Sequence, residues 1–326
     1  MEHAFARTNT IAGGSLPAGV SPSLLHLLDQ AIALAQGLAP EMPAVAQKLG
    51  DLALRLQEDR FHLAVLGQFK RGKSTLLNAL LGEPLLPSAV VPLTSIPTFI
   101  HAGRRLETKI SFQDENREEV FSCEQVEEMS NHLARFVAEE HNPKNRLGVS
   151  QVTVFHPAPI LQRGVVLIDT PGIGSTFRHN TEATLNFLPQ CDAALFVVSA
   201  DPPVTEVELE FLGQVRDKVA RLFFVLNKVD YLDPVERNQA AGFFKRVLRE
   251  QLGFPEDVTL FCVSARQGLE AAGRDDSALW RQSGMAELNE FLLDFLVEGK
   301  SSALNEAVAR KAADIVGEVA MRVDLA

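Results

Sequence analysis

The residues best suited to chemistry in this chain stand together in the segment GQFKRGKS, residues 67–74, between a short apolar run and the helical sequence TLLNALLG. Glycines at this spacing let successive backbone N–H groups curl around phosphate oxygens. Lys73 then reaches the β- and γ-phosphates, and the hydroxyl of Ser74 ligates Mg²⁺. The helix that follows directs the positive end of its dipole at the same anion. The segment therefore predicts a loop that binds nucleotide phosphates together with Mg²⁺.

A second motif, DTPG at 169–172, ends another strongly apolar run. An aspartate at the carboxyl end of a strand can hold Mg²⁺ through water, which is the role predicted for Asp169. The backbone N–H of Gly172 can be offered to a γ-phosphate. Downstream of a phosphate loop, this motif predicts the part of the site that senses the terminal phosphate.

A third motif, NKVD at 227–230, predicts the choice of base. The carboxylate of Asp230 can accept hydrogen bonds from N1–H and the 2-amino group of guanine, and adenine lacks both donors. Lys228 can cover the ring, and Asn227 can tie this loop to the phosphate loop. Ser264-Ala265-Arg266, after the last predicted strand, supplies backbone N–H groups suited to the guanine O6.

A threonine that contacts the metal and the γ-phosphate should lie between the phosphate loop and the DTPG motif. Thr94 is the better candidate, because it precedes a predicted strand that starts near Ile96. Thr98 is the alternative, and it would point from the strand itself.

These motifs need strands that end at one edge of a sheet, and the chain supplies them. Short apolar runs at 61–66, 165–169, 193–199, 222–227 and 259–264 alternate with helical segments at about 205–219 and 235–252. Such alternation predicts βαβ units in a mostly parallel sheet. Extra material lies between residues 97 and 156: two β-like runs, an amphipathic helix and a third β-like run. Apolar residues at helical spacing over 24–56 and 304–323 predict helices before and after the whole α/β region.

Composition narrows the function classes. The 326 residues carry 31 Lys plus Arg and 42 Asp plus Glu, so the formal charge is −11. Binding to nucleic acid through net charge is therefore not expected. The three cysteines are far apart and odd in number, which fits small core residues in a reducing cytoplasm.

Taken together, GQFKRGKSTLLNALLG, PLTS, DTPGIGST and NKVD resemble the motifs of the dynamin superfamily of large GTPases, in its bacterial dynamin-like branch. The 97 residues from Gly72 to Asp169 suit the enlarged GTPase domain of that family. The resemblance implies a three-layer α/β P-loop GTPase domain with an α-helical neck built from both chain ends. It also implies hydrolysis of GTP to GDP and phosphate, homodimers that pair through their GTPase domains when nucleotide is bound, and a role in membrane remodelling or tethering.

The expected organisation is a mobile terminus at 1–20, neck helices at 21–58, the GTPase domain at 59–299 and a truncated neck helix at 300–326. The helical spacing of apolar residues over 304–323 is not interrupted before the chain stops at Ala326, which predicts that the helix continues in a longer protein. The alternative is a natural terminus at which the helix frays. Membrane contact would then be peripheral, on the inner face of a bacterial membrane, and made by regions beyond this chain.

The sequence departs from the family at the catalytic positions. Phe69 and Lys70 replace the Gln-Ser of classical dynamins, which removes the serine that activates water there and helps to seat a monovalent cation. Either Lys70 or Arg71 could instead act as a cationic finger on the phosphates, or both could form a solvated basic pair. Ile173 stands where many small GTPases place a water-orienting glutamine. Two other functions therefore stay open: an Era/TrmE-like GTPase of RNA or ribosome maturation, and a GTP-binding scaffold with negligible turnover.

The predicted site residues fall into three overlapping groups. The catalytic candidates are Lys70, Arg71, Lys73 and Thr94; the metal-contacting candidates are Ser74, Thr94 and, through water, Asp169; and the nucleotide-binding candidates are Gly67, Gly72, Lys73, Ser74, Thr75, Asp169, Gly172, Asn227, Lys228, Asp230, Ser264, Ala265 and Arg266.

Overall fold

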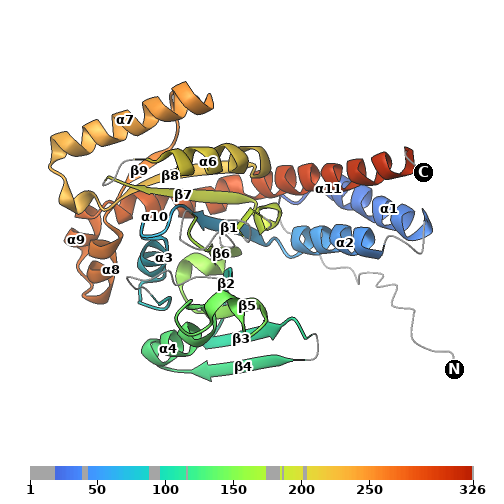
Figure 1. Ribbon diagram of the computed structural model, residues 1–326, viewed down its shortest axis with the longest axis horizontal. Helices are drawn as coiled ribbons and strands as arrows, with labels where there is room; N and C mark the ends of the chain where they lie inside the picture. The colour runs from blue at the N-terminus through green and yellow to red at the C-terminus, as the bar shows by residue number, and fades with distance from the viewer. Residues whose placement is uncertain are drawn as a thin grey trace.

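The computed structural model describes residues 19–38, 43–87, 96–114, 117–173, 184–185, 187–200 and 204–324. Figure 1 shows a single sheet with helices on both faces and a helical extension at one end. The strands are β1 (Phe61–Leu66), β2 (Thr98–Ala102), β3 (Leu106–Phe112), β4 (Glu118–Cys123), β5 (Val149–His156), β6 (Val165–Asp169), β7 (Ala193–Ser199), β8 (Arg221–Asn227) and β9 (Leu260–Cys262). The α-helices are α1 (Pro22–Leu38), α2 (Pro43–Gln57), α3 (Lys73–Leu81), α4 (Val126–Val137), α6 (Glu206–Lys218), α7 (Pro234–Leu252), α8 (Ala265–Gly273), α9 (Ser277–Gln282), α10 (Met285–Asp294) and α11 (Lys300–Asp324).

The nine strands follow the order β4-β3-β5-β2-β6-β1-β7-β8-β9. From β6 through β9 every neighbouring pair is parallel. The ends of β1, β6 and β8 therefore lie at one edge of the sheet, where ligands bind in open α/β sheets. Beyond β6 the pairing is mixed, because β2 is antiparallel to β6 but parallel to β5. The predicted α/β class with a mostly parallel sheet is confirmed.

The core lies on both faces of the sheet, as alternation along β1 shows. Leu63 and Val65 belong to one buried cluster, whereas Ala64 and Leu66 belong to the other. The first cluster includes residues of α3, α10 and α11, and the second includes residues of α6 and α7. The central strands are buried on both sides, which accounts for their nearly unbroken apolar sequence. The arrangement is the expected three-layer one.

The material between residues 97 and 156 extends the sheet rather than forming a separate layer. Strand β3 lies antiparallel to both β4 and β5, and α4 packs against β3 and β4. Strand β4 was not predicted. It is an edge strand whose residues alternate between exposed and half-buried, and Glu118 and Glu119 interrupt any apolar run.

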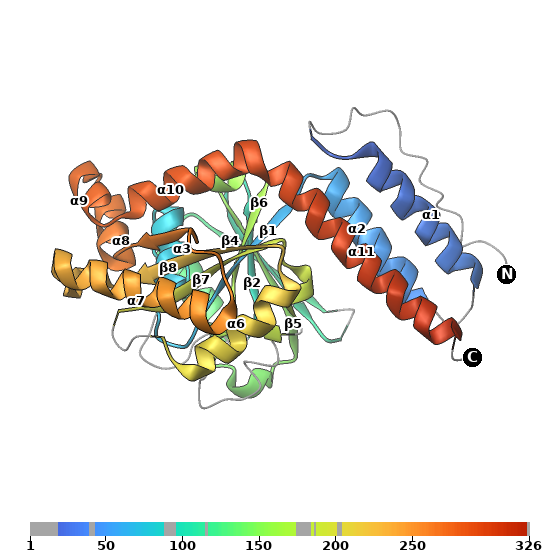
Figure 2. The same ribbon diagram turned by 90° about the horizontal axis from the view of Figure 1, so that it is seen from above.

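Helices α1, α2 and α11 lie side by side as a bundle beside the sheet (Figure 2). The junction with the sheet combines apolar packing with buried ion pairs. The fully buried carboxylate of Asp192, just before β7, accepts hydrogen bonds from Arg55 of α2 at 2.6 Å and from Lys311 of α11 at 2.8 Å. Lys300, at the start of α11, pairs with Asp59, which lies between α2 and β1. Among the described helices, none is long and apolar enough to cross a membrane.

Candidate nucleotide site

The loop between β1 and α3 contains glycines with positive φ, the backbone conformation that its glycines were expected to allow. Gly67 has φ +144° and Gly72 has φ +92°, and Gly72 is the N-cap of α3. A Cβ atom on Gly67 would collide with the carbonyl oxygen of Val197, so only glycine fits there. The backbone of this loop is therefore compatible with the predicted binding of an anion at the first turn of α3.

Lys73, the first residue of α3, lies inside this loop with its ammonium covered. Its Nζ donates to the backbone oxygen of Gln68 at 3.3 Å. Burial lowers the pKa of Lys73 to about 8, against the carboxylates of Asp169 and Glu208, which raise it. An anion bound here would therefore stabilise the charged form of the buried Lys73 ammonium.

The proposed metal ligands meet directly. The hydroxyl of Ser74 donates to Oδ2 of Asp169 at 2.8 Å, which brings the ends of β6 and the first turn of α3 together. Thr98, the alternative threonine, is buried at the start of β2 and is the register partner of Asp169. Thr94 lies outside the described residues. Thr75 is half-buried in the first turn of α3.

The DTPG segment packs onto the phosphate loop. The N–H of Phe69 donates to the oxygen of Ile173 at 3.1 Å, and the N–H of Ile173 donates to the oxygen of Gly67 at 3.3 Å. A Cβ on Gly172 would stand 2.9 Å from Cα of Phe69 and 3.0 Å from Nζ of Lys73. The side chain of Ile173 is fully buried. Gly172 therefore lies close to Lys73, the lysine that is expected to bind the terminal phosphates.

Asn227 joins three loops through one amide. Its Nδ2 donates to the backbone oxygen of Arg71 at 2.9 Å, and its Oδ1 accepts from the N–H of Ala265 at 3.0 Å. This links the loop after β1, the NKVD motif and the loop after β9, which is the contact expected of Asn227. The next residue, Lys228, adopts φ +64° and so redirects the chain towards Asp230.

The guanine-recognition candidate Asp230 already has a partner. Its side chain is only 4% exposed, and Nη2 of Arg266 donates to its Oδ2 at 2.8 Å. Burial acts to raise the pKa of Asp230, but hydrogen bonds from Ser264 and Arg266 outweigh it and hold the pKa below its usual value. Asp230 is therefore a charged acceptor at neutral pH. In this conformation Ala265 supports Asn227 rather than offering its N–H to a base.

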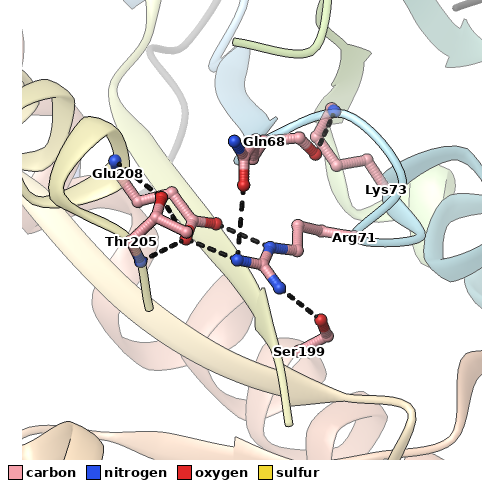
Figure 3. A network of polar contacts seen from close by, with 6 residues as sticks. All are labelled: Gln68, Arg71, Lys73, Ser199, Thr205 and Glu208. Atoms are coloured by element: carbon pink, nitrogen blue, oxygen red, sulfur yellow. Dashed lines mark hydrogen bonds and ion pairs between the residues drawn. The ribbon is translucent and has the colours of Figure 1, made fainter. Parts of the chain in front are cut away.

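The two basic residues of the phosphate loop behave differently. Lys70 is exposed, has φ +67° and holds its Nζ 5.3 Å from the ring centroid of Phe69. Arg71 is buried, and Figure 3 shows its guanidinium turned into a network with Glu208, Ser199 and Gln68. Arg71 is therefore already engaged within the protein, whereas Lys70 stands at the surface of the loop.

Glu208 is the member of this network that sequence reasoning missed. It completes the capping box of α6, where it exchanges hydrogen bonds with Thr205, and the same carboxylate binds Arg71. The spacing of Thr205 and Glu208 predicts a helix N-terminus, and no local signal connects that terminus to a loop 137 residues earlier.

The order of the strands and the two helical layers are those of a P-loop GTPase fold. Residues 63–229 match the Dynamin family, which is about half of the chain. The chain therefore belongs to the dynamin family, and its α/β region is a dynamin-type GTPase domain.

Known relatives agree with this assignment. The chain is 33% identical over 284 residues to the "Probable transmembrane GTPase FZO-like, chloroplastic" of Arabidopsis thaliana, covering 83% of this chain and 27% of that protein. It is 34% identical over 196 residues to the "Bacterial dynamin-like protein" of Nostoc punctiforme, covering 57% of this chain and 28% of that protein.

Solved structures show the same fold. One chain of an "oligomerised bacterial dynamin pair" superposes with a TM-score of 0.59 at 21% identity, covering 93% of this chain and 48% of that one. The chain thus spans less than a third of the two relatives above and about half of the superposed structure.

Proposed function

We propose that the protein binds guanine nucleotides at this site and hydrolyses GTP to GDP and phosphate with the help of Mg²⁺. The observation that carries this proposal is the bridge made by Asn227 between Arg71 and Ala265. Because one amide holds the proposed phosphate-binding loop to the proposed base-binding loop, this contact supports the binding of one nucleotide across both loops. The dynamin family match supports the same reaction.

The residues present suit a magnesium ion. Mg²⁺ prefers oxygen ligands and is usually held by one or two protein groups together with substrate phosphates. The hydroxyl of Ser74 and the carboxylate of Asp169, 2.8 Å apart, provide such oxygens. When bound there, the ion would neutralise charge that develops on the β- and γ-phosphates. Thr94 remains the proposed third contributor.

Lys73 and Lys70 are the proposed cationic groups of the reaction. Lys73 would bind the phosphates, since its ammonium is buried beside Gly172. Lys70 is favoured over Arg71 as a finger, because Arg71 is held by Glu208 and Lys70 is exposed. A finger acts mainly on charge in the transition state.

Positioning of the attacking water requires a group other than the side chain at 173, because Ile173 is apolar and buried. We propose that a second GTPase domain, facing the nucleotide, closes the site and acts together with Thr94 in positioning the attacking water. Such pairing would depend on the γ-phosphate, because γ-phosphate contacts order the switch segments of GTPases. Light scattering of apo, GDP and GDP–aluminium fluoride samples tests it: a doubled mass only with the transition-state analogue is expected, and an unchanged mass would refute it.

A membrane role is proposed for the longer protein. One structure similar to this chain belongs to a bacterial dynamin pair described as sensing and tethering membranes. We expect this acidic chain alone to bind neutral liposomes weakly, with contact made peripherally by regions outside it, on the inner face of a bacterial membrane. Strong co-sedimentation of this chain with neutral liposomes would contradict that assignment.

A GTP-binding scaffold with negligible turnover is the second candidate, and the buried Ile173 favours it. Phosphate release from GTP at several protein concentrations separates the two. An enzyme that completes its site by pairing gains specific activity with concentration, whereas a scaffold stays near the uncatalysed rate. The Era/TrmE-like alternative is weaker, because the family match is to dynamins.

A further inference from the structure

The carboxylate expected to recognise guanine is occupied by a side chain of the protein itself. Nη2 of Arg266 lies 2.8 Å from Oδ2 of Asp230, and Asp230 is almost completely covered. Guanine presents two donors, N1–H and the 2-amino group, and needs both oxygens of this carboxylate. One of the two oxygens that the base would use, Oδ2, is therefore already hydrogen-bonded to Arg266.

Arg266 and Asp230 differ in how much of each side chain is exposed to solvent. The Arg266 side chain is 70% exposed, so it can leave Asp230 without disturbing the core. Asp230 is held in place by the turn at Val229–Tyr231 and by the neighbouring Ser264. The arginine is thus the mobile member of the pair, and the acceptor is the fixed one.

A second acceptor for the displaced guanidinium lies one helical turn away. Glu270 is four residues further along α8, where side chains of a helix meet, and it currently pairs with Arg274 at 2.7 Å. Arg266, Glu270 and Arg274 line one cavity of about 510 Å³ with Gly82. The guanidinium can therefore move from Asp230 towards Glu270 without crossing the protein interior.

We propose that Arg266 is a built-in competitor for the base: it closes the guanine acceptor in the empty site and lowers the affinity for guanine nucleotides. This rests on the proposed function. Only molecules in which Arg266 has left Asp230 are competent to bind the base. The apparent dissociation constant equals the intrinsic one divided by the fraction of such molecules. Because the ion pair is exposed on one side, the effect is modest, about two- to fivefold.

Inosine nucleotides give a sharp control. Hypoxanthine keeps N1–H but lacks the 2-amino group, so it engages only one oxygen of Asp230 and leaves the other to Arg266. Removing Arg266 should therefore benefit GDP more than IDP. A general loss of positive charge near the phosphates would instead weaken both nucleotides equally.

The experiment measures binding of GDP and IDP to the parent chain, to Arg266→Ala and to Arg266→Gln by calorimetry. We expect GDP to bind about two- to fivefold more tightly to both variants, with a smaller gain for IDP, and stopped-flow mixing to place the gain in the association rate constant. Weaker GDP binding in the variants, or equal gains for GDP and IDP, would overturn the competitor role. A parent chain that binds neither nucleotide would overturn the proposed function instead.

Discussion

The guanidinium of Arg71 and the carboxylate of Glu208 form a buried ion pair with two hydrogen bonds, Nε to Oε1 at 2.7 Å and Nη2 to Oε2 at 2.6 Å. This pair connects the phosphate-binding loop after β1 to the first turn of α6. Ser199, at the end of β7, accepts a third bond from the same guanidinium. The conformation of the phosphate loop thus depends on a helix that follows a neighbouring strand.

Glu208→Gln should destabilise the fold because it leaves the charge of Arg71 buried without a full counter-charge. Breaking a buried pair on one side costs about 3–5 kcal/mol in the free energy of unfolding. The control is Glu306→Gln in the exposed pair between Arg221 and Glu306, which should cost no more than about 1 kcal/mol. Urea unfolding of both variants measures the difference, and equal small losses would show that the buried pair contributes little.

Nucleotide binding should take up a proton at alkaline pH, because the pKa of Lys73 is about 8 in the empty site and bound phosphates would raise it. Below about pH 7 the lysine is protonated in both states and no uptake is expected. As the pH rises past 8, the empty site loses its proton and the affinity falls. Calorimetry in two buffers of different ionisation enthalpy should find more than about half a proton taken up at about pH 8.5. No uptake at that pH would contradict a buried lysine that meets the phosphates.

Asp230→Asn should weaken GTP binding by about 1–3 kcal/mol, because a charged acceptor of two hydrogen bonds is replaced by an amide. ATP offers neither donor, so its binding should change little in the same variant. Competition binding with GTP and ATP measures both. Equal affinity of the parent chain for the two nucleotides would rule out Asp230 as the selector of the base.

Lys70→Ala should lower single-turnover hydrolysis of GTP at least about tenfold while changing GTP affinity less, as expected for a contact made mainly in the transition state. Lys48→Ala, which removes an exposed lysine from α2, is the matched control and should leave both quantities unchanged. Arg71→Ala should instead lower stability, because it leaves Glu208 buried without its cation. If hydrolysis in Lys70→Ala equals that of the parent, the finger assignment is wrong.

Much of the fold could be predicted, because central parallel strands such as β1 and β8 are buried on both faces and appear as apolar runs. Strand β4 could not, since an edge strand with glutamates carries no such run. Within the site, the motifs predicted that Asn227 joins the NKVD loop to the loop after β1, and the structure has that contact. The direct hydrogen bond from Ser74 to Asp169 was not predicted, although both residues were assigned to the same metal ion.

Contacts between side chains far apart in sequence could not be predicted from motif spacing or from apolar runs. The pairing of Arg71 with Glu208 and of Asp230 with Arg266 depends on rotamers and on how strand ends converge. Each residue considered alone has an ordinary interpretation: a basic loop residue, a helix cap, or a backbone donor. Only the three-dimensional arrangement shows that one basic residue of the phosphate loop is buried and the other exposed.

The most direct test of the central claim is release of inorganic phosphate from GTP, with Mg²⁺, by the parent chain and by Lys73→Ala. The chain is proposed to hydrolyse GTP at the loop that contains Lys73 and to complete its site by pairing. The parent should release phosphate from GTP but not from ATP, its specific activity should rise over a hundredfold range of protein concentration, and Lys73→Ala should release none. Phosphate release by the parent that never exceeds that of Lys73→Ala at any concentration would contradict the account.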